Sequence, residues 1–311
     1  MLTLFATPRA FRGNTGVIQT NAIQSWLLLH PDIQIILLGD EDGTAEVVRK
    51  FGVLHLPYVG CNEYRTPFLN SVFDVAQSFA RYGLVCYVNA DIILLGDFIE
   101  AVKRIYNSDF IKSVNRTHEQ SFLIVGQRYD VDLDSAIDFN DHEWDMKVRE
   151  YVKLKGQLHP KSGSDYFVFT RGMYNDIPSF AVGRGGWDNW LIYQARFLGV
   201  PVIDATRVVT AIHQNHDYSH IPNGNTVAWK GTESIRNAEL MEGEEHAFTI
   251  EHSNWKLIDI GMKRELTMRK LYFELAALPV LVPYLHFLSR PMQALTKLII
   301  TIRKGFVPQI R

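Results

Sequence analysis

Residues 87–95, YVNADIILL, combine the pattern of a buried strand with two polar side chains. The apolar and aromatic residues suit a strand that is packed on both faces, whereas Asn89 and Asp91 interrupt the run. Aspartate is among the residues that a strand interior tolerates least, and burying an unpaired carboxylate is costly. We therefore expect a cation, a metal ion or a donor-rich loop to lie opposite Asp91.

The sequence around this stretch alternates short apolar runs with amphipathic segments. Apolar runs predict strands at 2–7, 33–40, 53–59 and 84–95, and helical spacing predicts helices at 18–27, around 47–48 and at 68–80. Asp97 followed by Glu100 predicts a capping box at the start of a further helix. This alternation is typical of an α/β fold with a mainly parallel central sheet flanked by helices.

The second half of the chain has a more mixed pattern. Residues 109–115 and 120–126 predict paired strands, 164–172 a further strand, 185–199 a helix, and 200–220 two short strands and a His-rich loop. We expect one α/β domain over residues 1–260, followed by a basic, apolar helical tail over 261–311.

Composition excludes some classes of protein. Hydrophobic residues make up 47% and charged residues 21% of the 311 residues, which argues against general disorder, and a net charge of −2 gives no reason to expect nucleic acid. The two cysteines, Cys61 and Cys86, have no CxxC spacing and fit a reducing cytosol. The N-terminal sequence lacks the basic and long apolar regions of a signal peptide.

Polar residues follow three of the predicted strands. They are Thr7, Pro8 and Arg9 after the first strand, Asp40 after the second, and the segment 89–91. Ligands of open α/β sheets bind beyond the carboxyl ends of the strands, so these residues predict a site at one edge of the sheet.

The order of strand, Asn-Ala-Asp, apolar run and Gly-Asp-Phe resembles the DxD segment of the GT-A-fold nucleotide-diphospho-sugar glycosyltransferases. The amphipathic helix before it, NSVFDVAQSFARYG at 70–83, fits the same resemblance, which spans roughly residues 1–225. It implies a Rossmann-like GT-A domain and a divalent cation, Mn²⁺ or Mg²⁺, held against a nucleotide diphosphate. Asn89 replaces the first Asp of the motif and offers an oxygen without a charge. We therefore expect Asp91 to carry most of the metal binding.

The resemblance also implies a site for a nucleotide-sugar donor, which we expect to be a UDP-sugar. The residues expected on the donor side are Thr7, Pro8, Arg9, Asp40, Arg65, Asn89, Ala90 and Asp165. Among these, Asp40 would accept a hydrogen bond from the ribose or base, and Arg65 would offset the diphosphate charge. Asp165 would bind hydroxyls of the donor sugar.

The segment HQNHDYSH contains His213, His216 and His220. Three nearby imidazoles could form a zinc site of the hydrolase type, and a polar surface loop is the alternative. In several GT-A families a late His completes the metal shell, and His213, directly after a strand, fits that role best, with His216 second. Because a mixed Asn, Asp and His set includes no cysteine, Mn²⁺ is favoured over a structural zinc.

Asp188, in GRGGWDNW, resembles the acceptor-side acidic motif of the superfamily. Desolvation by Trp187 and Trp190 would raise its pKa, so that Asp188 could deprotonate an acceptor hydroxyl, and the indoles could stack on sugar rings. A base in this position makes the reaction inverting, whereas in a retaining enzyme Asp188 would position substrate. The alternative is that Asp188 caps a helix after a Gly-rich turn.

The acidic segment 130–141 has the carboxylate spacing of a calcium loop at Asp130, Asp132 and Asp134, but it lacks the Gly and Glu that such a loop needs. We interpret it as a solvated acidic loop.

Together these features predict a metal-dependent glycosyltransferase that transfers a sugar from a nucleotide-diphosphate donor to a hydroxyl acceptor, such as a lipid-linked or cell-surface glycan precursor. One alternative is a nucleotidyltransferase whose phosphate loop would be residues 8–16. The other is a non-catalytic sugar- or membrane-binding protein with a decayed metal site, for which Asn89 is the support.

The tail suggests a second role. Residues 271–288 are apolar except for Glu274 and His286, and from Lys263 to the end nine Lys and Arg face two Glu. Cations around apolar surface favour an anionic membrane leaflet, so we expect peripheral binding to the cytoplasmic face of the cell membrane. The alternative is that these helices pack on the domain or form a dimer interface.

Overall fold

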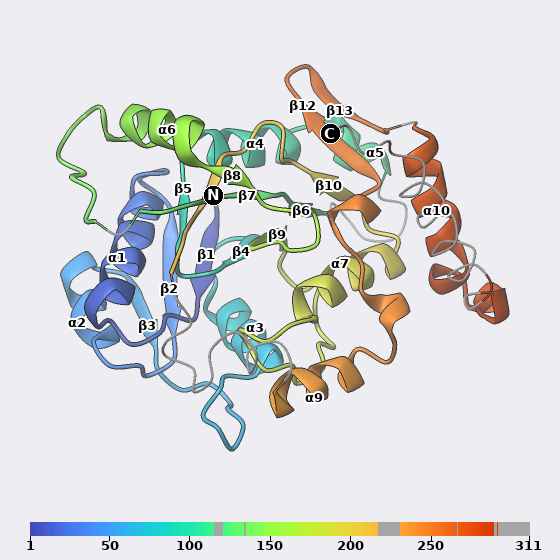
Figure 1. Cartoon of the computed structure of the whole chain (residues 1–311), viewed down its shortest axis with the longest axis horizontal. Helices are drawn as coiled ribbons and strands as arrows, with labels where there is room; N and C mark the ends of the chain where they lie inside the picture. The colour runs from blue at the N-terminus through green and yellow to red at the C-terminus, as the bar shows by residue number, and fades with distance from the viewer. Residues whose placement is uncertain (115–120, 134, 217–230, 266, 289–290, 292–311) are drawn as a thin grey trace, which may run out of the picture.

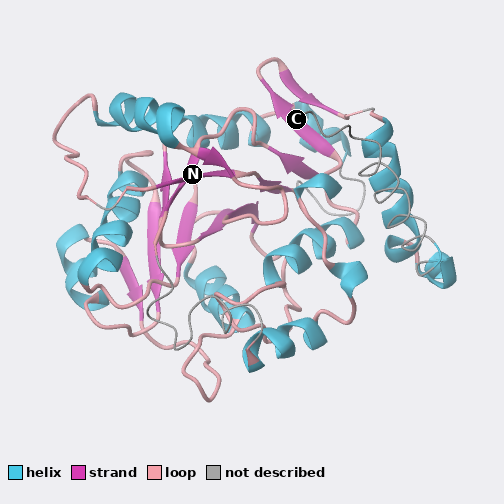
Figure 2. Cartoon of the chain, viewed as in Figure 1, coloured by secondary structure: helices cyan, strands magenta, loops and turns pink. Residues whose placement is uncertain are grey.

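The computed structural model describes residues 1–114, 121–133, 135–216, 231–265, 267–288 and 291. A nine-stranded central sheet carries helices on both faces, and a four-stranded sheet lies beside it (Figure 1). Figure 2 shows the two layers of helices around the strands. The predicted α/β class is confirmed.

The central sheet has the strand order β13-β12-β10-β6-β9-β4-β1-β2-β3. Its strands are β1 (Thr3–Ala6), β2 (Gln34–Leu38), β3 (Leu54–Leu56), β4 (Leu84–Val88), β6 (Leu123–Val125), β9 (Tyr166–Thr170), β10 (Val202–Asp204), β12 (Trp255–Ile258) and β13 (Gly261–Lys263). Only β9 and β13 run antiparallel to their neighbours in this sheet, so the described sheet is mainly parallel. All residues of β1 and β4 are buried, as expected for strands covered on both faces.

Most of the described helices cover one of the two faces of this sheet, and the helix over residues 144–155 packs against the four-stranded sheet instead. They are α1 (Gly13–Leu27), α2 (Thr44–Phe51), α3 (Leu69–Phe79), α4 (Gly96–Tyr106), α5 (Asp109–Val114), α6 (Trp144–Lys155), α7 (Trp187–Phe197), α9 (Thr232–Leu240) and α10 (Met268–Leu281), with short 3₁₀ turns at Glu244–His246, Ile250–His252 and Pro283–Leu288. Apolar residues of α1, α4 and α5 form one core with one face of the sheet, and those of α3, α7 and α10 form a second core with the other. Alternate side chains of each strand therefore enter opposite cores.

The smaller sheet has the order β5-β11-β7-β8. Its strands are β5 (Ile92–Leu94), β11 (Ala211–Gln214), β7 (Arg128–Val131) and β8 (Gln157–Leu158). The apolar pattern over 84–95 does not form one strand: β4 ends at Val88 in the central sheet, β5 begins at Ile92 in the other, and residues 89–91 follow the end of a strand, as predicted. A turn closed by the Ile92 N–H on the Asn89 carbonyl, at 3.1 Å, joins the two strands. The segment 89–91 therefore passes the chain from one sheet to the other.

Two local expectations are also wrong. Residues 109–114 form α5, because β6 finds its partners in β9 and β10 and leaves this segment free to be helical. Asp97 does not cap α4, whose N-cap residue is Leu95. The Asp97 carboxylate instead accepts hydrogen bonds from the Arg149 guanidinium at 2.7 Å and the Thr210 N–H at 3.2 Å.

Helix α10, in the first part of the predicted tail, packs against the domain. The Arg196 guanidinium contacts both oxygens of Glu274, at 3.2 and 2.8 Å, and Lys270 donates to the Glu251 carbonyl at 2.7 Å. No described helix is long and apolar enough to cross a membrane. Residues 292–311, the basic end of the tail, lie outside the described residues, and the domain boundary at 260 stays a prediction.

Candidate metal and nucleotide site

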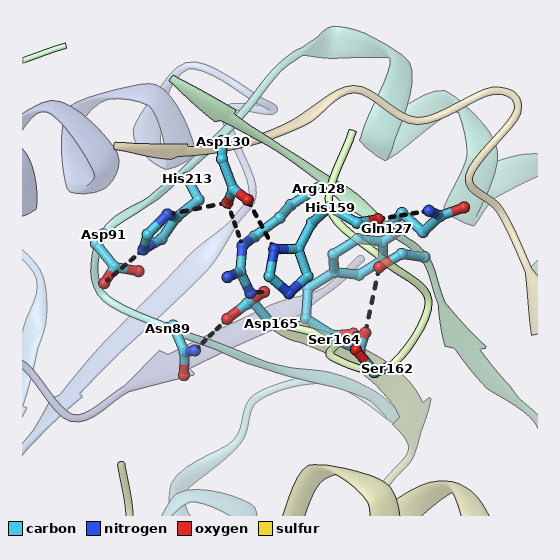
Figure 3. Close-up of polar contacts among 12 residues, drawn as sticks. Asn89, Asp91, Gln127, Arg128, Asp130, His159, Ser162, Ser164, Asp165 and His213 are labelled. Carbon is cyan, nitrogen blue, oxygen red and sulfur yellow. Dashed lines mark hydrogen bonds and ion pairs between the residues drawn. The ribbon is translucent and has the colours of Figure 1, made fainter. Parts of the chain in front are cut away.

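Asp91, His213 and His216 converge at the junction of the two sheets. Figure 3 shows Asp91 and His213 of this cluster. The antiparallel register of β5 and β11 pairs Ile92 with His213, which places His213 beside the turn that carries Asp91. Asp91 Oδ2 lies 3.1 Å from His216 Nε2 and 3.8 Å from His213 Nε2. All three side chains are less than one fifth exposed. The predicted first and second histidines therefore both face Asp91, and His220 lies outside the described residues.

Asp130 supports this cluster from strand β7. The parallel register of β7 and β11 pairs Asp130 with His213, and Asp130 Oδ1 lies 3.2 Å from His213 Nδ1. The other oxygen of Asp130 is 2.7 Å from His159 Nδ1. A carboxylate on Nδ1 of a histidine fixes the ring and leaves Nε2 available, as in many metal sites. Here that nitrogen points at Asp91.

The charges in this cluster determine its pKa values. Burial raises the pKa of Asp91, but the hydrogen bond from His216 and the nearby His213 outweigh burial and hold this pKa well below its ordinary range. Burial lowers the pKa of His213, yet Asp130 and Asp91 together raise it above its ordinary value. The structure therefore keeps Asp91 ionised.

The residues present fit a divalent metal ion. Asp91 Oδ1 is buried and has no hydrogen-bond partner among the described residues, so one oxygen of an ionised carboxylate is available to bind a cation. One carboxylate and two imidazoles, without cysteine, are ligands suited to Mn²⁺ and related ions. Three protein ligands also leave coordination positions for a substrate.

Asn89 is held by Asp165 in the structure. The Asn89 side-chain amide donates to Asp165 Oδ1 at 2.7 Å, and its backbone N–H donates to the Asp165 carbonyl at 2.9 Å. The Arg128 guanidinium forms an ion pair with the same carboxylate. An aspartate at position 89 would face a second carboxylate, which explains why an amide suits this position. A direct role of Asn89 on the metal, and of Asp165 on a sugar, stays a prediction.

The expected nucleotide residues line one cleft of about 1190 Å³. Thr7, Pro8 and Arg9 follow β1 and Asp40 follows β2, while Arg65 reaches the same cleft from the loop before α3. The charge of Arg9 acts on Asp91, so the cleft and the metal cluster are close. Ala90 is buried between Asn89 and Asp91. The structure thus brings Thr7, Pro8, Arg9, Asp40 and Arg65 to one cleft, which Asn89, Ala90 and Asp165 do not line, and their binding of a donor stays a prediction.

Arg65 has a positive φ of 64°, which is uncommon outside glycine. The loop is held by Asn62, whose side-chain oxygen accepts from the N–H groups of Tyr64 at 2.9 Å and Thr66 at 3.0 Å. The strained backbone therefore directs an exposed arginine at the rim of the cleft.

Asp188 lies in the first turn of α7, where Gly186 is the N-cap. Burial raises the pKa of Asp188 to about 6, the charge of Asp165 adds to this, and backbone N–H groups of Asn189, Asp188 and Ser164 offset only part of it. A carboxyl group with such a pKa can exchange a proton near neutral pH.

The expected stacking of sugars on the tryptophans is wrong for this structure. Trp187 and Trp190 are only 5% and 7% exposed, and the Trp187 ring packs edge-on against Tyr87 at 5.3 Å between centroids. Both indoles belong to the hydrophobic core, because the side of α7 that carries them packs against the central sheet.

Sequence reasoning missed Arg128, Asp130 and His159. The interpretation of Asp130 as part of a solvated loop is wrong, since Asp130 lies in β7 and contacts His213 and His159. The alternation of Arg128 and Asp130 across Tyr129 was the available signal, because residues two apart on a strand share a face. Only the pairing of β7 with β11 shows what that face meets.

No protein-family model and no curated protein matches the chain. Among solved structures, the chain is similar to the glucosyl-3-phosphoglycerate synthase of Mycobacterium tuberculosis in complex with Mn²⁺, UDP-glucose and phosphoglyceric acid. The two sequences are 16% identical, the match covers 78% of this chain and 79% of that chain, and the TM-score is 0.44. The same synthase with Mg²⁺ and UDP is 13% identical, with 70% and 72% covered and a TM-score of 0.41. TarS 1–349 of S. aureus is 13% identical, with 69% and 57% covered and a TM-score of 0.36. Likenesses of this degree do not identify the substrate of this chain, which has to be inferred from its own residues.

The metal cluster predicts direct binding of Mn²⁺ to the protein without any substrate. Replacement of Asp91 by Asn should abolish this binding in calorimetry, because the ionised ligand is lost. Asp130→Ala should weaken it by about 10- to 100-fold, since His213 loses its support. Asp141→Ala, in the same acidic segment but paired with Lys147 on the surface, should bind as the wild type does. Equal affinity in the Asp91 and Asp141 variants would refute the site.

The raised pKa of Asp188 predicts a pH-dependent stability. Between about pH 4 and 6 the folded state retains a proton that the unfolded chain has released, so stability falls as pH rises through this window and the cost remains above it. Asp188→Asn should therefore gain stability relative to wild type by about 2 kcal/mol between pH 4 and pH 7, measured by urea unfolding. Asp32→Asn, whose side chain is 74% exposed, is the control. If the difference in unfolding free energy between Asp188→Asn and wild type did not change from pH 4 to pH 7, the pKa of Asp188 would not be raised in the folded protein.

Proposed function

We propose that the protein is a metal-dependent glycosyltransferase that uses a nucleotide-diphosphate sugar, with a UDP-sugar as the expected donor. The observation that carries this proposal is the convergence of Asp91, His213 and His216 beside a cleft at the carboxyl edge of the sheet. In this arrangement a nucleoside would occupy the cleft and its diphosphate would lie toward Asp91. The volume of about 1190 Å³ is ample for a nucleotide sugar.

The residues of the chain would divide the work between binding and proton transfer. Thr7, Arg9 and Asp40 would hold the nucleoside, and Arg65 would balance the charge of the diphosphate. Asp91, His213 and His216 would hold Mn²⁺ or Mg²⁺, which supplies charge neutralisation to a leaving nucleoside diphosphate.

On the acceptor side, Asp188 would take a proton from the attacking hydroxyl at its carboxylate. Its raised pKa suits that role, because a base works best when its pKa is close to the operating pH. In a retaining enzyme the same carboxylate would instead position the substrate. Asp165, neutralised by Arg128, would remain a hydrogen-bond acceptor for sugar hydroxyls.

We also propose that the protein associates with the cytoplasmic face of a membrane, where a lipid-linked or cell-surface glycan precursor would be the acceptor. Helix α10 supports this, because its inner face carries the ion pairs to the domain and its outer face is apolar. The exposed residues on that outer face are Met268, Leu271, Leu275 and Leu278. An apolar stripe facing outward is the pattern of an interfacial helix.

Hydrolysis of UDP-, GDP- and dTDP-sugars with and without Mn²⁺ tests the proposed activity. Wild type should release nucleoside diphosphate only with the metal. Asp188→Asn, which cannot accept a proton, should reduce transfer to an acceptor by about 10²- to 10⁴-fold while donor binding stays near normal. Asp32→Asn should match wild type. Metal-independent turnover would exclude the proposed reaction, and a parallel loss of donor affinity in Asp188→Asn would make Asp188 a donor-site residue.

Cosedimentation with anionic vesicles tests the membrane proposal. Leu271→Glu with Leu275→Glu should release the protein, because both side chains lie on the outer face of α10 and buried apolar area is lost. Leu154→Glu, on the exposed surface of α6, is the matched control and should still bind. Equal binding of the α10 variant and the control would show that this face does not contact the membrane.

A further inference from the structure

A second cavity, of about 450 Å³, lies on the carboxyl edge of the sheet beyond β6, β10 and β12. Basic side chains dominate its walls. They are Lys161, Arg207, Lys256, Lys263 and Arg264, against the two acids Asp204 and Glu265. Neither the proposed metal site nor the proposed donor cleft uses any of them. We call this cavity the basic pocket.

The basic pocket contains an unfavourable pair of like charges. Lys256 on β12 and Lys263 on β13 are direct partners in the antiparallel register, so their side chains emerge on the same face of the hairpin. Like charges directly opposite each other destabilise a sheet. A hairpin that keeps two lysines in this register gains from an anion between them.

The acids of the pocket are already occupied. Asp204 lies 3.5 Å from Lys161 and also accepts from the Thr206 N–H at 2.9 Å. Glu265 pairs with Lys256 at 3.1 Å. Neither acid has an ion pair with Lys263 among the described residues.

Arg264 and Arg207, also in the wall of the pocket, have no ion pair with either acid of the pocket among the described residues. Arg264 stacks on the Trp255 ring at 4.8 Å, which orients the guanidinium without neutralising it. Among the described acids, Arg207 contacts the exposed Asp259, at a long distance of 3.7 Å. An anion entering the pocket would therefore meet several donors whose charge is not matched by an acid of the wall.

The amino terminus of α10 adds to this field. Thr267, the N-cap residue, lines the pocket, and its hydroxyl accepts from the Lys270 N–H at 3.1 Å. The first turn of this 14-residue helix carries no acidic side chain. Helix amino termini attract anions, so the helix and the cations act in the same direction.

We propose that the basic pocket binds a phosphate group, either of a soluble phosphate ester or of a lipid headgroup. Tetrahedral phosphate offers several acceptor oxygens, which suits separate Lys and Arg donors better than a single carboxylate does. The basic pocket is distinct from the metal cluster. Gln127 lines the pocket, whereas the next residue, Arg128, contacts Asp130 and Asp165 beside the metal cluster. The proposal does not depend on glycosyl transfer.

Calorimetry and thermal unfolding with inorganic phosphate and glycerol 3-phosphate test the soluble source, without metal or donor and at about 0.15 M salt. Both ligands should bind wild type and raise its Tm. Lys263→Gln with Arg264→Gln should weaken binding at least about tenfold, yet its own Tm without phosphate should stay close to that of wild type, because relief of the Lys256–Lys263 repulsion offsets the lost stacking of Arg264 on Trp255. Lys153→Gln with Lys155→Gln, exposed on α6, removes the same charge elsewhere and should bind normally.

Vesicles test the lipid source. Wild type should prefer vesicles with phosphatidic acid over vesicles given the same negative charge by a fatty acid, and only the pocket variant should lose this preference. Binding of soluble phosphate with no such preference assigns a soluble ester, and a preference without soluble binding assigns a headgroup. If neither ligand discriminates the pocket variant from the α6 control, the proposal is wrong.

Discussion

The buried carboxylate of Asp91, held between two imidazoles, is the interaction on which the site depends. Asp91 can be placed there only because the chain leaves the central sheet after Val88 and enters a second sheet at Ile92. That change of sheet pairs β5 with β11 and so sets His213 beside Asp91. The neighbouring histidines offset the cost of burying the charge, and within the part of the chain that the structure describes one carboxylate oxygen has no hydrogen-bond partner.

Around Asp91 the site is an alternating series of opposite charges. Asp91 meets His213, His213 meets Asp130, Asp130 meets Arg128 and His159, and Arg128 meets Asp165. Each acid of this series thus has a basic partner. The partner's charge offsets the cost of removing the carboxylate from water. The same series restricts side-chain orientations, because Asp130 and Arg128 each contact at least two oppositely charged neighbours. Such a site is organised before a ligand arrives, which is what binding a metal and a diphosphate requires.

The parallel strands explain why several candidate sites share one edge. The ends of β1 and β2 open into the large cleft, β4 leads into the metal cluster, and β6, β10 and β12 end at the basic pocket. At the carboxyl ends of parallel strands the connecting loops leave the sheet, and these loops can carry polar side chains without disrupting the core. Helix α10 covers the far part of the sheet and contributes both to the basic pocket and to the exposed apolar face.

The sequence by itself determined the α/β class, the mainly parallel sheet and the grouping of Thr7, Arg9, Asp40 and Arg65, because apolar periodicity and strand ends are local properties. It also indicated that a cation, a metal ion or a donor-rich loop lies opposite Asp91. Tertiary structure alone decided that residues 84–95 serve two sheets, that Asn89 is held by Asp165, and that Asp130 supports His213. The reason is physical: strand register brings together residues more than a hundred positions apart, such as Ile92 and His213, and no local pattern encodes which strands will pair.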